Sequence, residues 1–299
     1  IGISLSIVIT LFFLEFFLSF FPVNEGLRAQ AVNSKNPIFK FEPNRKAVFS
    51  KNWNFDIYNK VSVNNAGFVN NNDYDETLNT KLLSIVGDSY VEALMVPFNK
   101  SLSGILSKKT EENRVYSFAA SGAGLSQHLI WGKHAKEKYD SNFFIFVIIA
   151  NDFSESLEKY EISPGFHRFI LKNNKNWELS LSDYEPSLLR RMMRHSKLAM
   201  YLVTNLKIHA KLNIPLILGK YDKRKKFVSN FNADVSKEFW KDASSAADIY
   251  LDNIEDFIGT DKSRILFVID GIRPELYEKN ISKEVINSFW FKMRNYFIQ

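Results

Sequence analysis

The sequence contains no cysteine. Disulfide bonds, thiolate metal sites and cysteine nucleophiles are therefore excluded, and the chain fits an oxidising or a reducing compartment. Several short signatures are also missing, namely Gly-x-Ser-x-Gly, His-Glu-x-x-His, the P-loop and the complete dinucleotide fingerprint. Without these patterns the sequence gives no sign of a zinc peptidase or of a nucleotide-binding protein of those types, and we expect neither a metal nor a cofactor.

A large excess of charge is missing as well. The 299 residues include 39 Lys and Arg against 33 Asp and Glu, a net charge of +6. Because this charge is spread along the chain, it gives no indication of nucleic-acid binding. The one dense basic cluster, residues 220–226, is most simply a solvated turn, and attraction of an anionic glycan is the alternative.

Residues 3–23 are strongly apolar, since fifteen of the twenty-one are Leu, Ile, Val or Phe. At about −0.4 kcal/mol each they favour membrane insertion by about 6 kcal/mol, against about +3 kcal/mol for Glu15. The sequence therefore predicts a transmembrane anchor within residues 1–23, with a cleaved signal or a buried helix as alternatives. Residue 1 is Ile rather than Met, so we expect the chain to begin inside a longer protein.

Residues 24–80 are polar and rich in Asn and Lys. Short β-like pieces at 61–63 and 66–68, with Asn-rich turns between them, predict a loosely structured lead-in that carries one hairpin.

From residue 81 to residue 299, strand and helix patterns alternate. This alternation predicts an α/β domain with a parallel sheet and helices on both faces. The expected strands are 82–86, 115–118, 143–149, 214–218 and 265–269, and the expected helices are 90–95, 102–109, 125–139, 188–210 and 235–257. Residues 152–187 show no clear periodicity and are too long for a plain connection, so we interpret them as a functional insertion or cap.

The motif Gly-Asp-Ser stands between the first of these strands and its helix. Ser89 follows Gly87 and Asp88 directly, so its hydroxyl is expected at the carboxyl edge of the sheet, beside free N–H groups of a helix start. A serine nucleophile needs this placement next to donors for an oxyanion. The simpler interpretation is a strand–turn–helix in which Asp88 or Ser89 caps the helix.

Two further blocks follow the next two strands. Gly122 lies in Ser-Gly-Ala-Gly, where a glycine lets the backbone approach a ligand, and Asn151 precedes Asp152 where an amide can hold an oxyanion. Taken singly, these residues also fit loop punctuation and a helix cap. Because strand ends of a parallel sheet share one edge, we expect all three blocks to meet there. Asp88, Asp152 and, after the last strand, Arg273 are candidates for substrate contacts, although Asp88 also suits a turn-shaping role.

In these blocks the chain resembles the SGNH (GDSL-type) hydrolase superfamily over residues 81–299. Ser89 matches its nucleophile, Gly122 its second-block glycine and Asn151 its third-block asparagine. The resemblance implies a three-layer flavodoxin-like α/β/α fold. It also implies an oxyanion hole made by the Ser89 N–H, the Gly122 N–H and the Asn151 amide.

The chain departs from the family in its fourth block, Asp-x-x-His, which supplies the base. None of the five histidines has Asp three positions earlier: His128, His134, His167, His195 and His209. We expect this block beyond Gln299 in a domain truncated at its C-terminus, and a chain without a base, or recruitment of His167 from the insertion, is the alternative.

The resulting prediction is a membrane-anchored serine esterase or O-acyltransferase, with its catalytic domain outside the cytoplasm. Resemblance to membrane-attached members suggests O-acetyl groups of envelope carbohydrate, or a lipid ester, as substrate. The alternative is a non-catalytic envelope binding or assembly protein that keeps the fold.

Overall fold

The computed structural model describes residues 2–299 apart from 111–113, 161–162, 173–175, 209–234 and 272–280. Along the chain its elements are α1 (Gly2–Leu18), β1 (Arg45–Lys51), β2 (Ile57–Val63), β3 (Leu82–Gly87), α2 (Ser89–Glu92), η1 (Phe98–Lys100), α3 (Leu102–Lys109), β4 (Arg114–Ala119), α4 (Leu125–Tyr139), β5 (Phe143–Ile148), α5 (Asp152–Glu155), η2 (Glu158–Tyr160), β6 (His167–Leu171), β7 (Trp177–Leu181), α6 (Leu188–Met193), α7 (Lys197–Met200), η3 (Tyr201–Asn205), α9 (Lys237–Ile258), η4 (Lys262–Arg264), β8 (Ile265–Ile269), α11 (Lys283–Asn287) and α12 (Phe289–Ile298).

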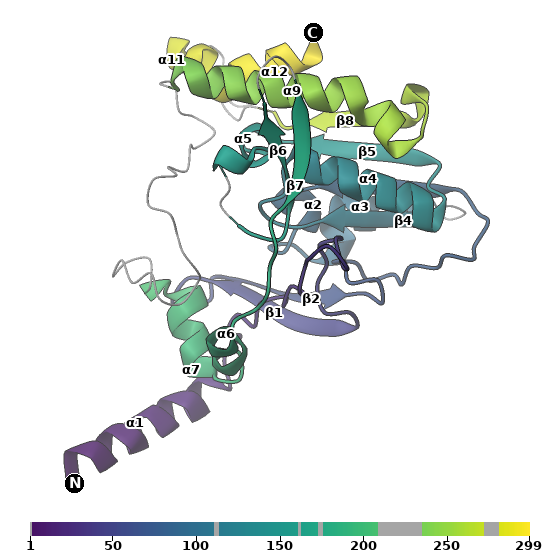
Figure 1. Ribbon diagram of the computed structural model, residues 1–299. Coiled ribbons are helices and arrows are strands. Elements are labelled where there is room, and N and C mark those ends of the chain that lie inside the picture. Colours follow the sequence, from purple (N-terminus) through teal and green to yellow (C-terminus); the bar gives the residue numbers. More distant parts are fainter. Residues whose placement is uncertain (1, 111–113, 161–162, 173–175, 209–234, 272–280) are drawn as a thin grey trace.

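Four strands form a parallel sheet in the order β4-β3-β5-β8 (Figure 1). β3 pairs with β4 on one side and with β5 on the other, as the first three strands of a flavodoxin-type sheet do. The strands predicted at 82–86, 115–118, 143–149 and 265–269 are therefore confirmed. The strand predicted at 214–218 lies outside the described residues.

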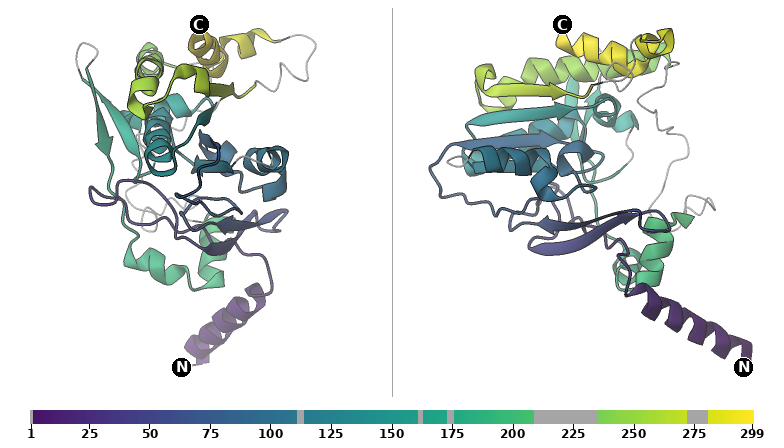
Figure 2. Two further views of the ribbon diagram at one scale, coloured as in Figure 1. Left: turned by 90° about the vertical axis from the view of Figure 1, so that its right-hand side faces the viewer. Right: turned by 180° about the vertical axis from the view of Figure 1, so that it is seen from behind.

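Helices cover both faces of this sheet and make three layers (Figure 2). On one face Phe118 and Phe146 belong to the large core that also contains residues of α4, α9 and α12. On the other face Ile85 and Val147 pack with residues of α2 and α3, including Leu106. Successive residues of a strand point to opposite faces of the sheet. Because helices cover both faces, most residues of these strands are apolar.

Helix boundaries follow their capping residues. α4 is confirmed over the predicted range, and α9 begins after Ser236, whose side chain accepts from Phe239 N, and ends at Gly259 in the left-handed region. The helix predicted at 90–95 is shorter than expected. It ends at Glu92 because Ala93 adopts a φ of 51°.

The single helix predicted at 188–210 is wrong. α6 ends at Met193, and α7 starts anew after Ser196, whose hydroxyl accepts from Ala199 N. The chain then continues into one π-helical stretch over Tyr201–Asn205. A serine with extended backbone at its N-cap interrupts the helix although the apolar spacing runs on.

The lead-in is packed into the domain more tightly than its composition suggests. It carries one antiparallel hairpin, β1-β2. Phe68 and Tyr74 are buried, and Tyr74 stacks on Tyr116 of β4 with 3.9 Å between ring centroids. The buried indole of Trp131 in α4 donates to the carbonyl of Phe39 at 3.1 Å. These contacts make residues 24–80 part of the same core.

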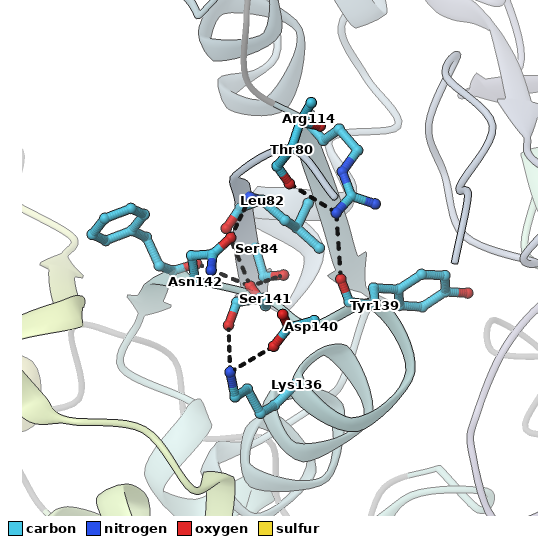
Figure 3. A network of polar contacts seen from close by, with 10 residues as sticks. Thr80, Leu82, Ser84, Arg114, Lys136, Tyr139, Asp140, Ser141 and Asn142 are labelled. Carbon is cyan, nitrogen blue, oxygen red and sulfur yellow. Dashed lines mark hydrogen bonds and ion pairs between the residues drawn. The ribbon is translucent and has the colours of Figure 1, made fainter. Parts of the chain in front are cut away.

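Polar contacts close the amino-terminal edge of the sheet (Figure 3). The Asn142 side chain accepts from Leu82 N at 2.9 Å, and the Ser141 hydroxyl bonds to that of Ser84 at 2.8 Å. The Arg114 guanidinium donates to the carbonyl of Thr80 at 3.0 Å. These contacts tie the strand starts to the loops that precede them.

The transmembrane anchor predicted for residues 1–23 is not found. α1 ends at Leu18, five residues earlier than expected, and among the described residues no helix combines the length and apolar content needed to cross a membrane. α1 projects from the body beyond α7 (Figures 1 and 2).

Glu15, the one charged residue of α1, has a structural role at the start of α7. Its carboxylate accepts from the Ser196 hydroxyl at 2.7 Å, from Lys197 N at 2.6 Å and from Leu198 N at 2.8 Å. It thus satisfies backbone donors that a helix start leaves without partners, and its negative charge suits the positive end of the helix.

We predict that Glu15→Ala destabilises the fold by about 1–2 kcal/mol, the usual effect of losing a helix cap. Urea denaturation measures the global change. Hydrogen exchange should show lost protection of the Lys197 and Leu198 amides. Glu185→Ala, which removes an exposed carboxylate paired with Arg191, is the control and should change neither. Unchanged exchange at both amides would contradict the capping role.

Candidate active site

The Gly-Asp-Ser motif forms a sharp junction between β3 and α2. Asp88 is fully buried and caps α2, since one carboxylate oxygen accepts from Tyr90 N at 2.9 Å. The other oxygen accepts from the Ser89 hydroxyl at 3.0 Å. Ser89 itself is exposed at the first position of the helix. A rigid, solvent-accessible hydroxyl therefore stands at the carboxyl edge of the central strand.

The second block lies in the loop between β4 and α4. Gly122 has a φ of +86°, a left-handed conformation that an L side chain rarely adopts. The neighbouring Ser121 donates its backbone N–H to the carboxylate of Glu92 at 3.0 Å and also donates its hydroxyl to it. Because Glu92 ends α2, these bonds fasten the Gly122 loop to the helix that begins at Ser89.

The third block follows β5. Asn151 precedes α5, and its amide nitrogen donates to Glu155 at 2.9 Å. The buried carboxylate of Asp152 accepts from Ile149 N at 2.8 Å, which fixes the turn out of the strand. Its second oxygen has no partner among the described residues.

The second and third blocks pack backbone to backbone at Gly124. A Cβ atom at this position would lie 2.7 Å from the carbonyl oxygen of Asp152 and 2.5 Å from Ser156 N. Only a glycine fits so close an approach. Together with the Glu92–Ser121 contact, this packing links the three loops that carry Ser89, Gly122 and Asn151 at one edge of the sheet.

The insertion lies against the second block. The side chains of Ser163 and Phe166 come within 3.9 Å of the Cβ position at Gly122. The Ser126 hydroxyl donates to the carbonyl of His167 at 2.7 Å. The described part of residues 152–187 thus contains α5, η2 and the β6-β7 hairpin, and it adjoins the edge where the three loops meet.

Four buried acids surround this edge: Asp88, Glu92, Asp152 and Glu155. Burial raises the pKa of each, because the charged form loses its hydration. Repulsion by Asp88 adds to the effect on Glu92, Asp152 and Glu155, and it is the first cause after burial for Asp152. For Glu92 the pKa reaches about 7. The loops of the three blocks therefore share one electrostatic environment.

Histidine does not complete the site within the part of the chain that the structure describes. The Ser89 hydroxyl bonds to Asp88, and no contact with a described histidine is recorded. His167 lies beside Gln127, 3.3 Å from its side-chain oxygen, and burial lowers its pKa to about 4. His128 is wholly buried, with a pKa lowered to about 3.

Arg273 and residues 220–226 fall outside the described residues. Over the residues that are described, no group of three His, Asp or Glu side chains could hold a metal ion.

Glu92 and Glu155 were not among the residues predicted from the sequence. The available signal was spacing, since Glu92 follows Ser89 by three positions and Glu155 follows Asn151 by four, distances that put side chains on one side of a helix. Burial of either carboxyl depends on tertiary packing.

Comparison with known proteins gives few matches. No family model and no curated protein matches the sequence. Among solved structures, the crystal structure of TesA has 11% sequence identity and a TM-score of 0.29, covering 73% of this chain and 94% of that chain. AlinE4, titled an SGNH-hydrolase family esterase, and a mutant of it have 11% identity and TM-scores of 0.30, covering 73% and 95%. Because TM-scores this low do not establish a shared fold, the α/β fold assigned here rests on the strand order and the layers.

We predict that Glu92→Gln removes a pH-dependent loss of stability. With a pKa of about 7 in the folded state against an ordinary 4.5, wild-type Glu92 costs stability as pH rises through this interval, by up to about 3 kcal/mol. Glutamine keeps an acceptor for Ser121 and has no proton to lose. Urea denaturation should show equal stability near pH 4.5 and a more stable variant above pH 7.

The control for this prediction is Glu137→Gln, which changes an exposed glutamate of α4. Its free energy of unfolding should follow the wild-type pH profile. A Glu92→Gln profile parallel to that of the wild type would show that Glu92 ionises normally.

Proposed function

We propose that the chain is a serine esterase or O-acyltransferase that forms an acyl-enzyme on Ser89. The observation that carries the proposal is the link between three loops from three neighbouring strands, through Glu92–Ser121 and through Gly124. It supports a shared cradle for one carbonyl group. The predicted substrate is an O-acetyl ester of envelope carbohydrate, or a lipid ester.

In the proposed reaction the Ser89 oxygen attacks the ester carbonyl, and a tetrahedral oxyanion forms. The Ser89 N–H, the Gly122 N–H and the second N–H of the Asn151 amide stabilise it, while Glu155 accepts the first N–H of that amide. Collapse of the intermediate breaks the ester C–O bond, and the leaving oxygen takes the proton that the base removed from Ser89, so that the alcohol departs. Water or a sugar hydroxyl then takes the acyl group from Ser89, which completes hydrolysis or transfer.

The proton of Ser89 needs an acceptor. In the described residues its hydroxyl donates to Asp88, which orients it. A histidine from an Asp-x-x-His block, predicted from the sequence, would be this acceptor. The extracytoplasmic location and a membrane partner also remain predictions.

We predict that Ser89→Ala, in a protein that includes the predicted Asp-x-x-His block, abolishes hydrolysis of p-nitrophenyl acetate above the uncatalysed rate, because the acyl acceptor is removed. Asn151→Ala should lower kcat by about 10²–10³, the effect of losing one oxyanion donor. Release of p-nitrophenolate is followed by its absorbance. Ser244→Ala, which changes a serine on the exposed side of α9, should keep the wild-type rate.

The second candidate is a non-catalytic binding or assembly protein of the same fold. It is favoured by the bond from Ser89 to Asp88 rather than to a described histidine. Equal rates for wild type and Ser89→Ala would support this candidate and remove Ser89 from any reaction.

A further inference from the structure

A small cavity lies away from the sheet edge, between β1 and the α6-α7 region. It has a volume of about 70 Å³ and is lined by Asn24, Glu25, Arg28, Arg45, Arg194, His195, Lys197 and Met200. A cavity needs about 15 Å³ to hold one water molecule, so this cavity has room for a small polyatomic ion.

The charge around this cavity is unbalanced. Arg28 pairs with Glu42 at 3.6 Å, and Lys197 pairs with Glu25 at 2.8 Å. Arg45 and Arg194 also line the cavity, and no ion pair within 4.0 Å is recorded for either among the described residues. Four cations thus lie near three carboxylates, Glu15, Glu25 and Glu42, and Arg45 and Arg194 keep the lining cationic.

The arginine side chains also keep unused donors. The Nε atoms of Arg28 and Arg45 are buried without a hydrogen-bond partner among the described residues. A buried N–H without an acceptor destabilises the fold, and more so when the group is charged. Burial lowers the pKa of Arg45 and of Arg194, and repulsion by Arg28 adds to this in both. An anion in the cavity would offset these costs together.

We propose that this cavity binds a phosphate group. Guanidinium groups present planar pairs of N–H donors that match phosphate oxygens, and three arginines converge here. A phosphate monoester carries about −1.5 to −2 charges at neutral pH, so one group can pair with both Arg45 and Arg194. The site is separate from Ser89 and does not depend on the proposed reaction.

The phosphate group can belong to a soluble phosphate or to a lipid headgroup. The apolar helix α1 adjoins this region, because Glu15 caps α7 next to the cavity-lining Lys197. Two ligand preparations distinguish the sources: inorganic phosphate, and phosphatidylcholine vesicles with or without phosphatidic acid.

We predict saturable binding of inorganic phosphate to the 299-residue chain, measured by calorimetry at constant ionic strength with chloride as the balancing anion. Arg45→Gln and Arg194→Gln should each weaken binding tenfold or more. The matched control is Arg191→Gln. Arg191 lies in α6, which ends at the C-cap Arg194, but it is exposed and paired with Glu185. This variant should bind phosphate as the wild type does.

Thermal unfolding without phosphate separates ligand binding from a structural role. Because Arg194 is held among like charges, Arg194→Gln should leave the melting temperature unchanged or raise it, whereas loss of a structural arginine would lower it. The wild type is compared on the two vesicle preparations. If more of it sediments with vesicles that contain phosphatidic acid than with phosphatidylcholine alone, and Arg194→Gln loses this difference, the ligand is a lipid headgroup. Phosphate binding without this difference between vesicles would assign a soluble ligand. Absence of both phosphate binding and the vesicle difference would overturn the proposal.

Discussion

The hydrogen bonds from Ser121 to the buried carboxyl of Glu92 hold the candidate site together. They join the end of α2 to the loop after β4, while the bare backbone of Gly124 lets that loop pack against the turn after β5. β3, central in the sheet, presents Ser89 between these two loops. The edge therefore depends on one buried acid and one glycine, and neither belongs to the residues expected to touch a substrate.

Local patterns in the sequence were sufficient for most of the fold. The four strands of the parallel sheet are short runs of mostly apolar residues, and α4 and α9 have clear spacing and ends, so their ranges were predictable. The placement of Ser89, Gly122 and Asn151 after successive strands followed from the rule that parallel strands end at one edge. The helix predicted over 188–210 failed because capping at Ser196, supported by Glu15 from a distant helix, outweighs continuous spacing.

Other features depend on contacts that a sequence does not display. Glu15 in an apolar run looked like a cost of membrane insertion, whereas in the fold it accepts three hydrogen bonds. No prediction from the sequence concerned Glu92, whose carboxyl is buried against Ser121. The two charge clusters have opposite sign and separate positions, with carboxyls at the sheet edge and guanidinium groups beside α6 and α7. This separation suits a chain that binds a neutral ester at one site and an anion at another.

The proposed function requires that the loop contacts hold Ser89 in an oxyanion cradle and that the predicted histidine base makes its hydroxyl reactive. Reaction with a fluorophosphonate tests it most directly, because the adduct places a phosphoryl oxygen where the oxyanion would lie. Intact-mass and peptide mass spectrometry should find one adduct, on Ser89, that forms more slowly in Asn151→Ala. No adduct on Ser89, or equal labelling of other serines, would contradict it.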